Sequence, residues 1–201
     1  MHIELTEMLR CPEPHQEDIL VLSTGEMLGR MVRFGILGCP VCRKEYPIAK
    51  GIVDFMGRGK AAATPAPRSP LPPPDPQALQ ALLELSGPGG FVVLLGGATR
   101  HAVGLAGLMA GIHFIGINAP SDVEELPVLS LLRSDDKIPL RQSIARGVVV
   151  GADLATSSWL VEANRILLRG RRFVVEHANP ELPIGLEKLA AAEGLWVGEK
   201  K

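Results

Sequence analysis

The chain has 201 residues, a formal net charge of −1 at pH 7 and a mean hydropathy of +0.19. This length allows one medium-sized domain, or one medium-sized and one very small domain. A charge this close to zero gives no electrostatic footprint for nucleic acid, so nucleic-acid binding is not indicated. The apolar composition, with only 21% charged residues, predicts a buried interface between domains or with a partner.

Targeting and membrane signals are not expected from the sequence pattern. Residues 1–5 have no positively charged region and no apolar core, so they do not resemble a signal peptide. The apolar run at residues 90–97 is too short to span a membrane. The three cysteines fall in a candidate metal site and not in a disulfide pattern, which predicts a reducing compartment and a cytoplasmic location.

Residues 1–56 are predicted to form a small N-terminal domain. A short helix is expected at residues 5–9, and the turn residues Ser23-Thr24-Gly25 separate the first two strands. The apolar residues are too few for an independent core, so a bound metal is expected to supply the missing stability. The predicted strands lie at residues 19–22, 31–36, 46–48 and 51–55.

Four side chains in this domain have the types and spacing of metal ligands. Cys39-Pro-Val-Cys42 is a CxxC pair, and Cys11-Pro-Glu-Pro-His15 supplies a second pair. Three thiolates and one imidazole suit tetrahedral Zn²⁺ and leave no coordination position open for water. The sequence therefore predicts a structural zinc site, which folds the domain and performs no chemistry itself.

The same residues allow other interpretations. CxxC is also a redox motif, but that interpretation expects a thioredoxin-like βαβ context, whereas a strand–turn–strand pattern surrounds Cys39 and Cys42. His15 is the weakest of the four ligands, because CxxxH is a looser spacing than a second CxxC. Glu13 or Glu17 could replace it, or the site could be vestigial.

Proline dominates residues 57–76, which are predicted to link the two domains. Proline lacks a backbone donor and favours extended polyproline geometry, so a semi-rigid spacer is expected. A Pro-rich ligand motif is the alternative interpretation.

Helical and apolar strand-like segments alternate over residues 77–201. Strands that are buried on both faces and alternate with helices predict an α/β domain with a doubly wound, Rossmann-like parallel sheet. Helices are expected at residues 77–85, 101–110, 157–168 and 184–192. Strands are expected at residues 91–95, 113–117, 128–132, 147–151, 172–176 and 195–198.

The N-terminal domain resembles the small zinc-ribbon family that includes the activator subunit of tRNA and translation-factor methyltransferases. The resemblance rests on Leu9-Arg10-Cys11-Pro12, on the CxxC pair, and above all on the run YPIAKGIVDF at residues 46–55. The chain departs from that family in having His15 where a cysteine is usual. The resemblance implies a zinc module that docks onto methyltransferase-fold domains.

Residues 76–198 resemble a class I S-adenosylmethionine-dependent methyltransferase. The order of elements matches, as do the run EANRILLRGRRFVV at residues 162–175 and the segment Ile138-Pro139-Leu140. The resemblance implies a cofactor site at the ends of the first three strands of this domain.

The glycine motif of that family is degenerate in this chain. The motif has an acidic residue in the first strand, followed by three spaced glycines that let the backbone approach the cofactor. Leu94 stands at the acidic position, and Gly96, followed by Gly97, holds the first glycine position. Ala98 and Arg100 replace the second and third glycines, and Arg100 would place a long charged side chain in the pocket.

The two acids that contact the nucleoside part of the cofactor are also replaced. Asn118 stands where an acid binds the ribose hydroxyls, and Ser134 stands where an acid contacts adenine, unless Asp135 or Asp136 shifts into that position. Three independent losses predict that S-adenosylmethionine is not bound. We therefore expect no catalytic residues and no cofactor-binding residues in this cleft.

Two further acids follow predicted strands at the edge where α/β sites form. Glu176-His177 is the best remaining indication of chemistry, although nothing supplies it with a nucleophile. Asp153 lies where some methyltransferases carry a functional polar residue, without the aromatic partner that amine methylation usually needs.

Together these patterns predict a zinc ribbon (residues 1–56), a linker (residues 57–76) and a shortened methyltransferase-like domain (residues 77–201). The seventh, antiparallel strand of the sheet is expected to be missing, which would leave an open edge. The predicted function is a non-catalytic scaffold or regulatory subunit. The alternatives are an active methyltransferase with an atypical pocket, or a binder of another small ligand in which Arg100 contacts an anion.

Association as a homodimer or with a protein partner is also predicted. The expected docking residues are apolar side chains of the ribbon and of the last strand, namely Ile52, Val53, Phe55, Leu195, Trp196 and Val197.

Overall fold

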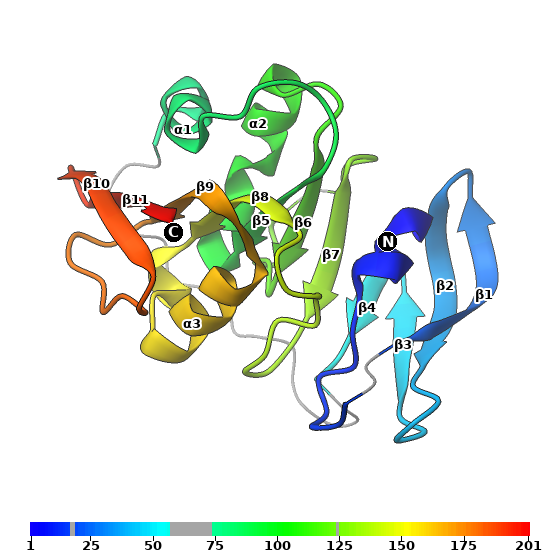
Figure 1. The fold of residues 1–201 in the computed structure, drawn as a ribbon. Helices are drawn as coiled ribbons and strands as arrows, with labels where there is room; N and C mark the ends of the chain where they lie inside the picture. Colours follow the sequence, from blue (N-terminus) through cyan, green and yellow to red (C-terminus); the bar gives the residue numbers. More distant parts are fainter. Residues whose placement is uncertain (17–18, 57–73, 124) are drawn as a thin grey trace.

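In the computed structural model, the described part of the chain forms a single eleven-stranded sheet (Figure 1). The structure describes residues 1–16, 19–56, 74–123 and 125–201. Most of the predicted linker lies outside these residues. The strand order is β1-β2-β3-β4-β7-β6-β5-β8-β9-β11-β10, so the first four strands belong to the N-terminal module and the rest to the α/β module.

The N-terminal module is an antiparallel meander preceded by a short 3-10 helix. The Lys50-Gly51 turn joins its last two strands, and both turn residues have positive φ, at 51° and 78°, as a two-residue type I′ hairpin requires. Burial alternates along β3, where Tyr46 and Ile48 face inward. The elements are η1 Ile3–Met8, β1 Val21–Leu28, β2 Met31–Gly38, β3 Glu45–Ala49 and β4 Ile52–Asp54.

The α/β module has the doubly wound parallel sheet that the sequence predicts. From β5, β6 and β7 follow in one direction and β8 and β9 in the other, so the order reverses between β5 and β8. Its elements are α1 Pro76–Leu83, β5 Phe91–Leu95, η2 Gly96–His101, α2 Ala102–Leu108, β6 His113–Ile117, β7 Leu129–Arg133, β8 Ala145–Val150, η3 Ala152–Leu154, α3 Ser157–Ile166, β9 Leu167–Val175, β10 Leu186–Ala192 and β11 Leu195–Lys200.

The carboxyl-terminal end of the sheet differs from the prediction. The helix expected at residues 184–192 is strand β10, and β11 lies between β9 and β10, antiparallel to both. The seventh strand is therefore present. A Glu193-Gly194 turn, with φ of 52° and 80°, forms the hairpin. This pairing overrides the helical propensity of Leu-Glu-Lys-Leu-Ala-Ala-Ala.

Helices cover the two faces of the sheet unequally. The core on one face contains α1 and α2, and the core on the other contains α3 and the segment around η1. Asp75 caps α1 by accepting a hydrogen bond from the Ala78 amide at 3.3 Å, and Pro76 occupies the first turn. None of the helices in the described residues is long and apolar enough to cross a membrane.

The two modules are joined by backbone pairing. β4 pairs in parallel with β7, with Ile52 opposite Leu131 and Val53 opposite Leu132. A second contact pairs Leu9 with Leu140 in an isolated antiparallel bridge. One apolar core runs under both contacts, so the N-terminal module and the α/β module share buried side chains.

Candidate metal centre and glycine loop

The structure brings all four predicted metal ligands together. The donor atoms of Cys11, His15, Cys39 and Cys42 all lie within 4.8 Å of one another. The Cys11 and Cys42 sulfurs are 3.7 Å apart, and the Cys39 sulfur is 3.4 Å from Nε2 of His15. Three thiols and an imidazole converging from two loops make a donor set that fits one tetrahedral ion.

Local turns position these ligands. Cys39 and Cys42 lie in the turn between β2 and β3, where the Cys39 amide donates to the Lys44 carbonyl and the Arg43 amide donates to the Cys39 carbonyl, each at 2.9 Å. Arg43 has φ of 61°, which lets the chain reverse within the knuckle. Cys11 follows η1 on a segment that is fastened to residues 139–141 by the Leu9–Leu140 bridge.

The thiols differ in how easily they ionise. Burial raises the pKa of Cys11 to about 11. Burial also opposes ionisation of Cys39, but the backbone amides of Cys42 and Val41 and the neighbouring thiols outweigh it, so its pKa falls to about 7. Cys39 therefore has a lower pKa than Cys11 and is deprotonated more readily, as a metal ligand must be.

Sequence reasoning missed one contact to this cluster. The Tyr46 hydroxyl lies 3.1 Å from the Cys11 sulfur and is buried with it. A hydroxyl that can donate to a ligating sulfur fixes the ligand's orientation. The inward-facing position of Tyr46 in a predicted strand next to the CxxC pair was the available signal.

The structure distinguishes His15 from the acidic residues that could replace it as the fourth ligand. Its Nε2 faces Cys39, whereas Glu13 forms an ion pair with Lys44 at 2.7 Å. Glu17 lies outside the described residues.

The glycine loop after β5 holds a carboxylate from its own chain. Oδ1 of Asp153 accepts a hydrogen bond from the Gly97 amide at 2.8 Å. Gly96 has φ of +57°, and a Cβ atom there would collide with the Asp153 carboxylate. At Gly151 a Cβ would lie 2.7 Å from Asp153 Oδ1. The three glycines therefore form a cradle that Asp153 fills from η3, across the point where the strand order reverses.

The other residues that the sequence assigned to the cofactor motif make contacts within the chain. Leu94 and Ala98 are fully buried in the apolar core on the α1 and α2 face. Arg100 donates two hydrogen bonds to the Asp122 carboxylate, each at 3.0 Å. This bidentate pair holds the Arg100 guanidinium on Asp122, instead of leaving it unpaired in the cleft.

Asn118 and Ser134 form two hydrogen bonds with each other. The Asn118 side-chain amide donates to the Ser134 carbonyl at 2.8 Å and accepts from the Ser134 amide at 2.9 Å. These two contacts join the ends of β6 and β7 and use both polar atoms of the Asn118 side-chain amide. The Lys137 ammonium then reaches the Pro12 carbonyl at 3.2 Å, so the same loop contacts the metal-ligand segment.

Glu176 has a partner that the sequence did not reveal. Its Oε1 lies 2.5 Å from Nε2 of His101, and both side chains are largely buried. His101 comes from the end of η2 and Glu176 from the end of β9, so the pair crosses the carboxyl edge of the sheet. His177, by contrast, is exposed and uses Nδ1 to accept from the Asn179 amide.

Comparisons with known proteins show similarity in solved structures only. No family model and no curated protein matches the sequence. One chain of a complex between the Haloferax volcanii Trm112 methyltransferase activator and a putative methyltransferase is 17% identical, with a TM-score of 0.47, over 62% of this chain and 89% of that chain.

Two other structures are methyltransferases. A putative methyltransferase from Bacillus halodurans is 16% identical over 53% of this chain and 52% of its own, with a TM-score of 0.42. Geranyl diphosphate C-methyltransferase from Streptomyces coelicolor is 14% identical over 50% of this chain and 41% of its own, also at 0.42. The chain thus spans about half or less of these two proteins. The strand order and register therefore carry the fold assignment.

Proposed function

We propose that this protein is a non-catalytic, methyltransferase-like interaction subunit whose zinc module is docked onto its α/β module within one chain. The observation that carries the proposal is the Asp153 carboxylate in the glycine cradle of Gly96, Gly97 and Gly151. A negative charge at this position repels the carboxylate of an amino-acid-type cofactor and occupies the amide that would approach it.

The contacts of the remaining cleft residues support the same proposal. Leu94 and Asn118 carry no negative charge to bind the cofactor's ammonium and ribose hydroxyls. Each lost hydrogen bond to a charged group costs about 1.5–3 kcal/mol, so two losses would weaken a micromolar site to roughly millimolar affinity or beyond. We infer that S-adenosylmethionine is not a ligand of this protein.

The metal centre has a structural role in this proposal. Cys11, His15, Cys39 and Cys42 would hold one Zn²⁺, and four protein ligands leave the ion no free position for substrate or water. The ion supplies stability to a module whose core is small.

We place the surface for a protein partner on the β1–β2 hairpin, because four of the six predicted docking residues are buried, whereas Ile52 and Leu195 are half-buried. Trp196, Val197, Val53 and Phe55 are all buried within the chain. On the hairpin, Val21, Phe34 and Ile36 expose 59%, 42% and 41% of their surface. β1 is also a terminal strand of the sheet, so its outer backbone groups are available for pairing.

The alternative function is an active methyltransferase with an atypical pocket, which the left-handed Gly96 loop favours. Calorimetric titration of the zinc-loaded protein with S-adenosylmethionine separates the two. We expect no saturable heat below about 1 mM, because the cleft lacks two charged contacts. Micromolar binding would overturn the proposal. The Asn118→Asp/Arg100→Gly variant is the comparison, because it restores an acid and a glycine, and a gain of binding there would locate the former cofactor site.

A further inference from the structure

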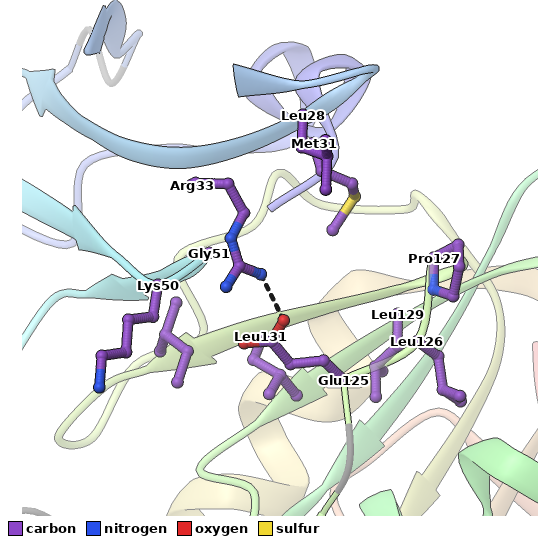
Figure 2. A pocket seen from close by; sticks show the side chains of 11 residues that line it. Leu28, Met31, Arg33, Lys50, Gly51, Glu125, Leu126, Pro127, Leu129 and Leu131 are labelled. Carbon is purple, nitrogen blue, oxygen red and sulfur yellow. Dashed lines mark hydrogen bonds and ion pairs between the residues drawn. The ribbon is translucent and has the colours of Figure 1, made fainter. Parts of the chain in front are cut away.

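A groove lies along the seam between the two modules, away from the metal cluster and the glycine cradle (Figure 2). Its volume is about 350 Å³, which lies at the lower end of the range for small-molecule sites. Ile52 and Leu131, directly opposite each other in the β4–β7 ladder, form part of its lining. The groove therefore exists only because the two modules share one sheet.

The groove is open because no helix covers this part of the sheet. Parallel neighbours are usually joined by a helical crossover. Among the described residues between β6 and β7, however, the connection contains no helix. Leu126 and Pro127 of this connection line the groove together with Leu129 and Leu131 of β7.

The lining combines apolar side chains with an excess of positive charge. Arg33 and Glu125 form an ion pair between β2 and the loop before β7. Lys50 is exposed at one end and has no hydrogen bond or ion pair within the described residues. Since Glu125 balances Arg33, Lys50 is the uncompensated charge of the lining. The apolar lining consists of Leu28, Met31, Ile52, Leu126, Pro127, Leu129 and Leu131.

The geometry of the β3–β4 turn fixes the position of the Lys50 backbone. Lys50 and Gly51 form the two-residue turn with positive φ, so the Cα of Lys50 is held at the point where β3 reverses into β4. An ammonium on a flexible stem is a point charge that attracts one anionic group. An apolar body lying along Ile52 and Leu131 would extend from that group.

We propose that this groove binds a free medium-chain monocarboxylic acid, with its carboxylate at Lys50 and its alkyl chain along the β4–β7 seam. A groove of about 350 Å³ with lining residues from both modules suits a single free chain, whereas a membrane surface would need a broad apolar face. Burying the alkyl chain supplies the free energy, at about 25 cal/mol per Å² of apolar surface, and the lysine supplies selectivity for the acid.

The test is a titration of the full-length, zinc-loaded protein with decanoate, followed by calorimetry and by the NMR signal of the Met31 methyl group. We expect saturable binding of one decanoate and a shift of that signal. Decylamine and decanol should bind at least tenfold more weakly, since neither carries a negative charge for Lys50.

Charge-reversal variants complete the test. Lys50→Glu should weaken decanoate binding at least tenfold, whereas Lys188→Glu, on the exposed face of β10, should leave it unchanged. Lys50→Ala serves if Lys50→Glu lacks native circular dichroism. Three results would each overturn the proposal: no saturation by decanoate up to about 1 mM, equal affinity in the Lys50 variants, or binding to phosphatidylglycerol vesicles without binding of the free acid.

Discussion

Ile52 and Leu131 are Cα partners in a parallel ladder, although they come from the N-terminal module and the α/β module, respectively. Strand addition of this kind couples two units through backbone hydrogen bonds, which do not depend on side-chain identity. The shared core beneath the ladder adds apolar burial. The stability of one module is therefore expected to depend on the other.

The first prediction concerns the metal. Purified protein should contain one zinc per chain, with sulfur ligands at about 2.3 Å and nitrogen at about 2.0–2.1 Å. Cys42→Ser should lose the zinc and lower the denaturation midpoint of the whole chain in one transition, because the modules are coupled. Val41→Ser, an exposed non-ligand in the same turn, is the control. A Cys42→Ser protein that keeps its zinc would contradict the ligand assignment.

The second prediction concerns the seam. Val53 is fully buried in β4 opposite Leu132. Val53→Asp should destabilise the chain by about 3 kcal/mol or more, because an unpaired carboxylate is buried. Hydrogen exchange should then quicken in β7 as well as in β4. Ser23→Asp, on the exposed side of β1, should change neither the stability of the chain nor the hydrogen exchange of these strands. Unaltered exchange in β7 would show that the modules fold independently.

The third prediction tests the glycine cradle. A methyl group at Gly151 would lie 2.8 Å from the Ala98 amide nitrogen and 2.9 Å from that of Gly97. Because backbone cannot yield as a flexible side chain does, Gly151→Ala should cost about 1–3 kcal/mol in urea unfolding. Gly107→Ala is the matched control, since nothing lies within 4 Å of its Cβ and alanine favours the helix. Equal stabilities of the two variants would contradict the close packing of Gly151 against the backbone of Gly97 and Ala98.

The fourth prediction is a pH dependence. Burial lowers the pKa of His113 to about 4, and the nearby His2, whose ring centroid lies 4.3 Å away, adds to the effect. The unfolded chain protonates this histidine near pH 6.5, so between pH 6.5 and 4 the unfolded state binds more protons. The stability contribution is therefore complete above pH 6.5 and is lost as the pH falls.

Denaturation at several pH values checks this dependence. His113→Gln should flatten the fall in unfolding free energy between pH 6.5 and 4. His177→Gln, at an exposed position, should show the same dependence of unfolding free energy on pH as the parent protein. A parent slope that persists in His113→Gln would assign the dependence to other groups.

The fifth prediction concerns association. If the β1–β2 hairpin docks a partner or a second copy, Phe34→Glu should abolish that complex in analytical ultracentrifugation. Val161→Glu is the matched control, because Val161 exposes a similar 53% of its surface on α3. Charge added at the hairpin opposes burial of the apolar face, whereas charge on α3 does not. A complex that survives Phe34→Glu and dissociates with Val161→Glu would move the docking surface to α3.

The sequence alone predicted the parallel α/β fold and the four candidate ligands whose donor atoms converge, for a physical reason. The types and spacing of metal ligands can be read within short stretches of sequence. Strands that are buried on both faces can be recognised as continuous apolar runs, such as residues 91–95. The sequence also predicts that Leu94 and Asn118 replace acidic cofactor contacts, because each position has its own chemical requirement, and this stays a prediction.

Tertiary structure alone decided how these parts combine. Residues 186–192 have helical propensity but pair as a strand, because β11 offers a partner and Glu193-Gly194 offers the turn. Likewise, nothing local shows that Asp153 reaches Gly97, that His101 meets Glu176, or that β4 pairs with β7. Each of these contacts joins residues far apart in the chain, and their free energy depends on surfaces that only the folded sheet brings together.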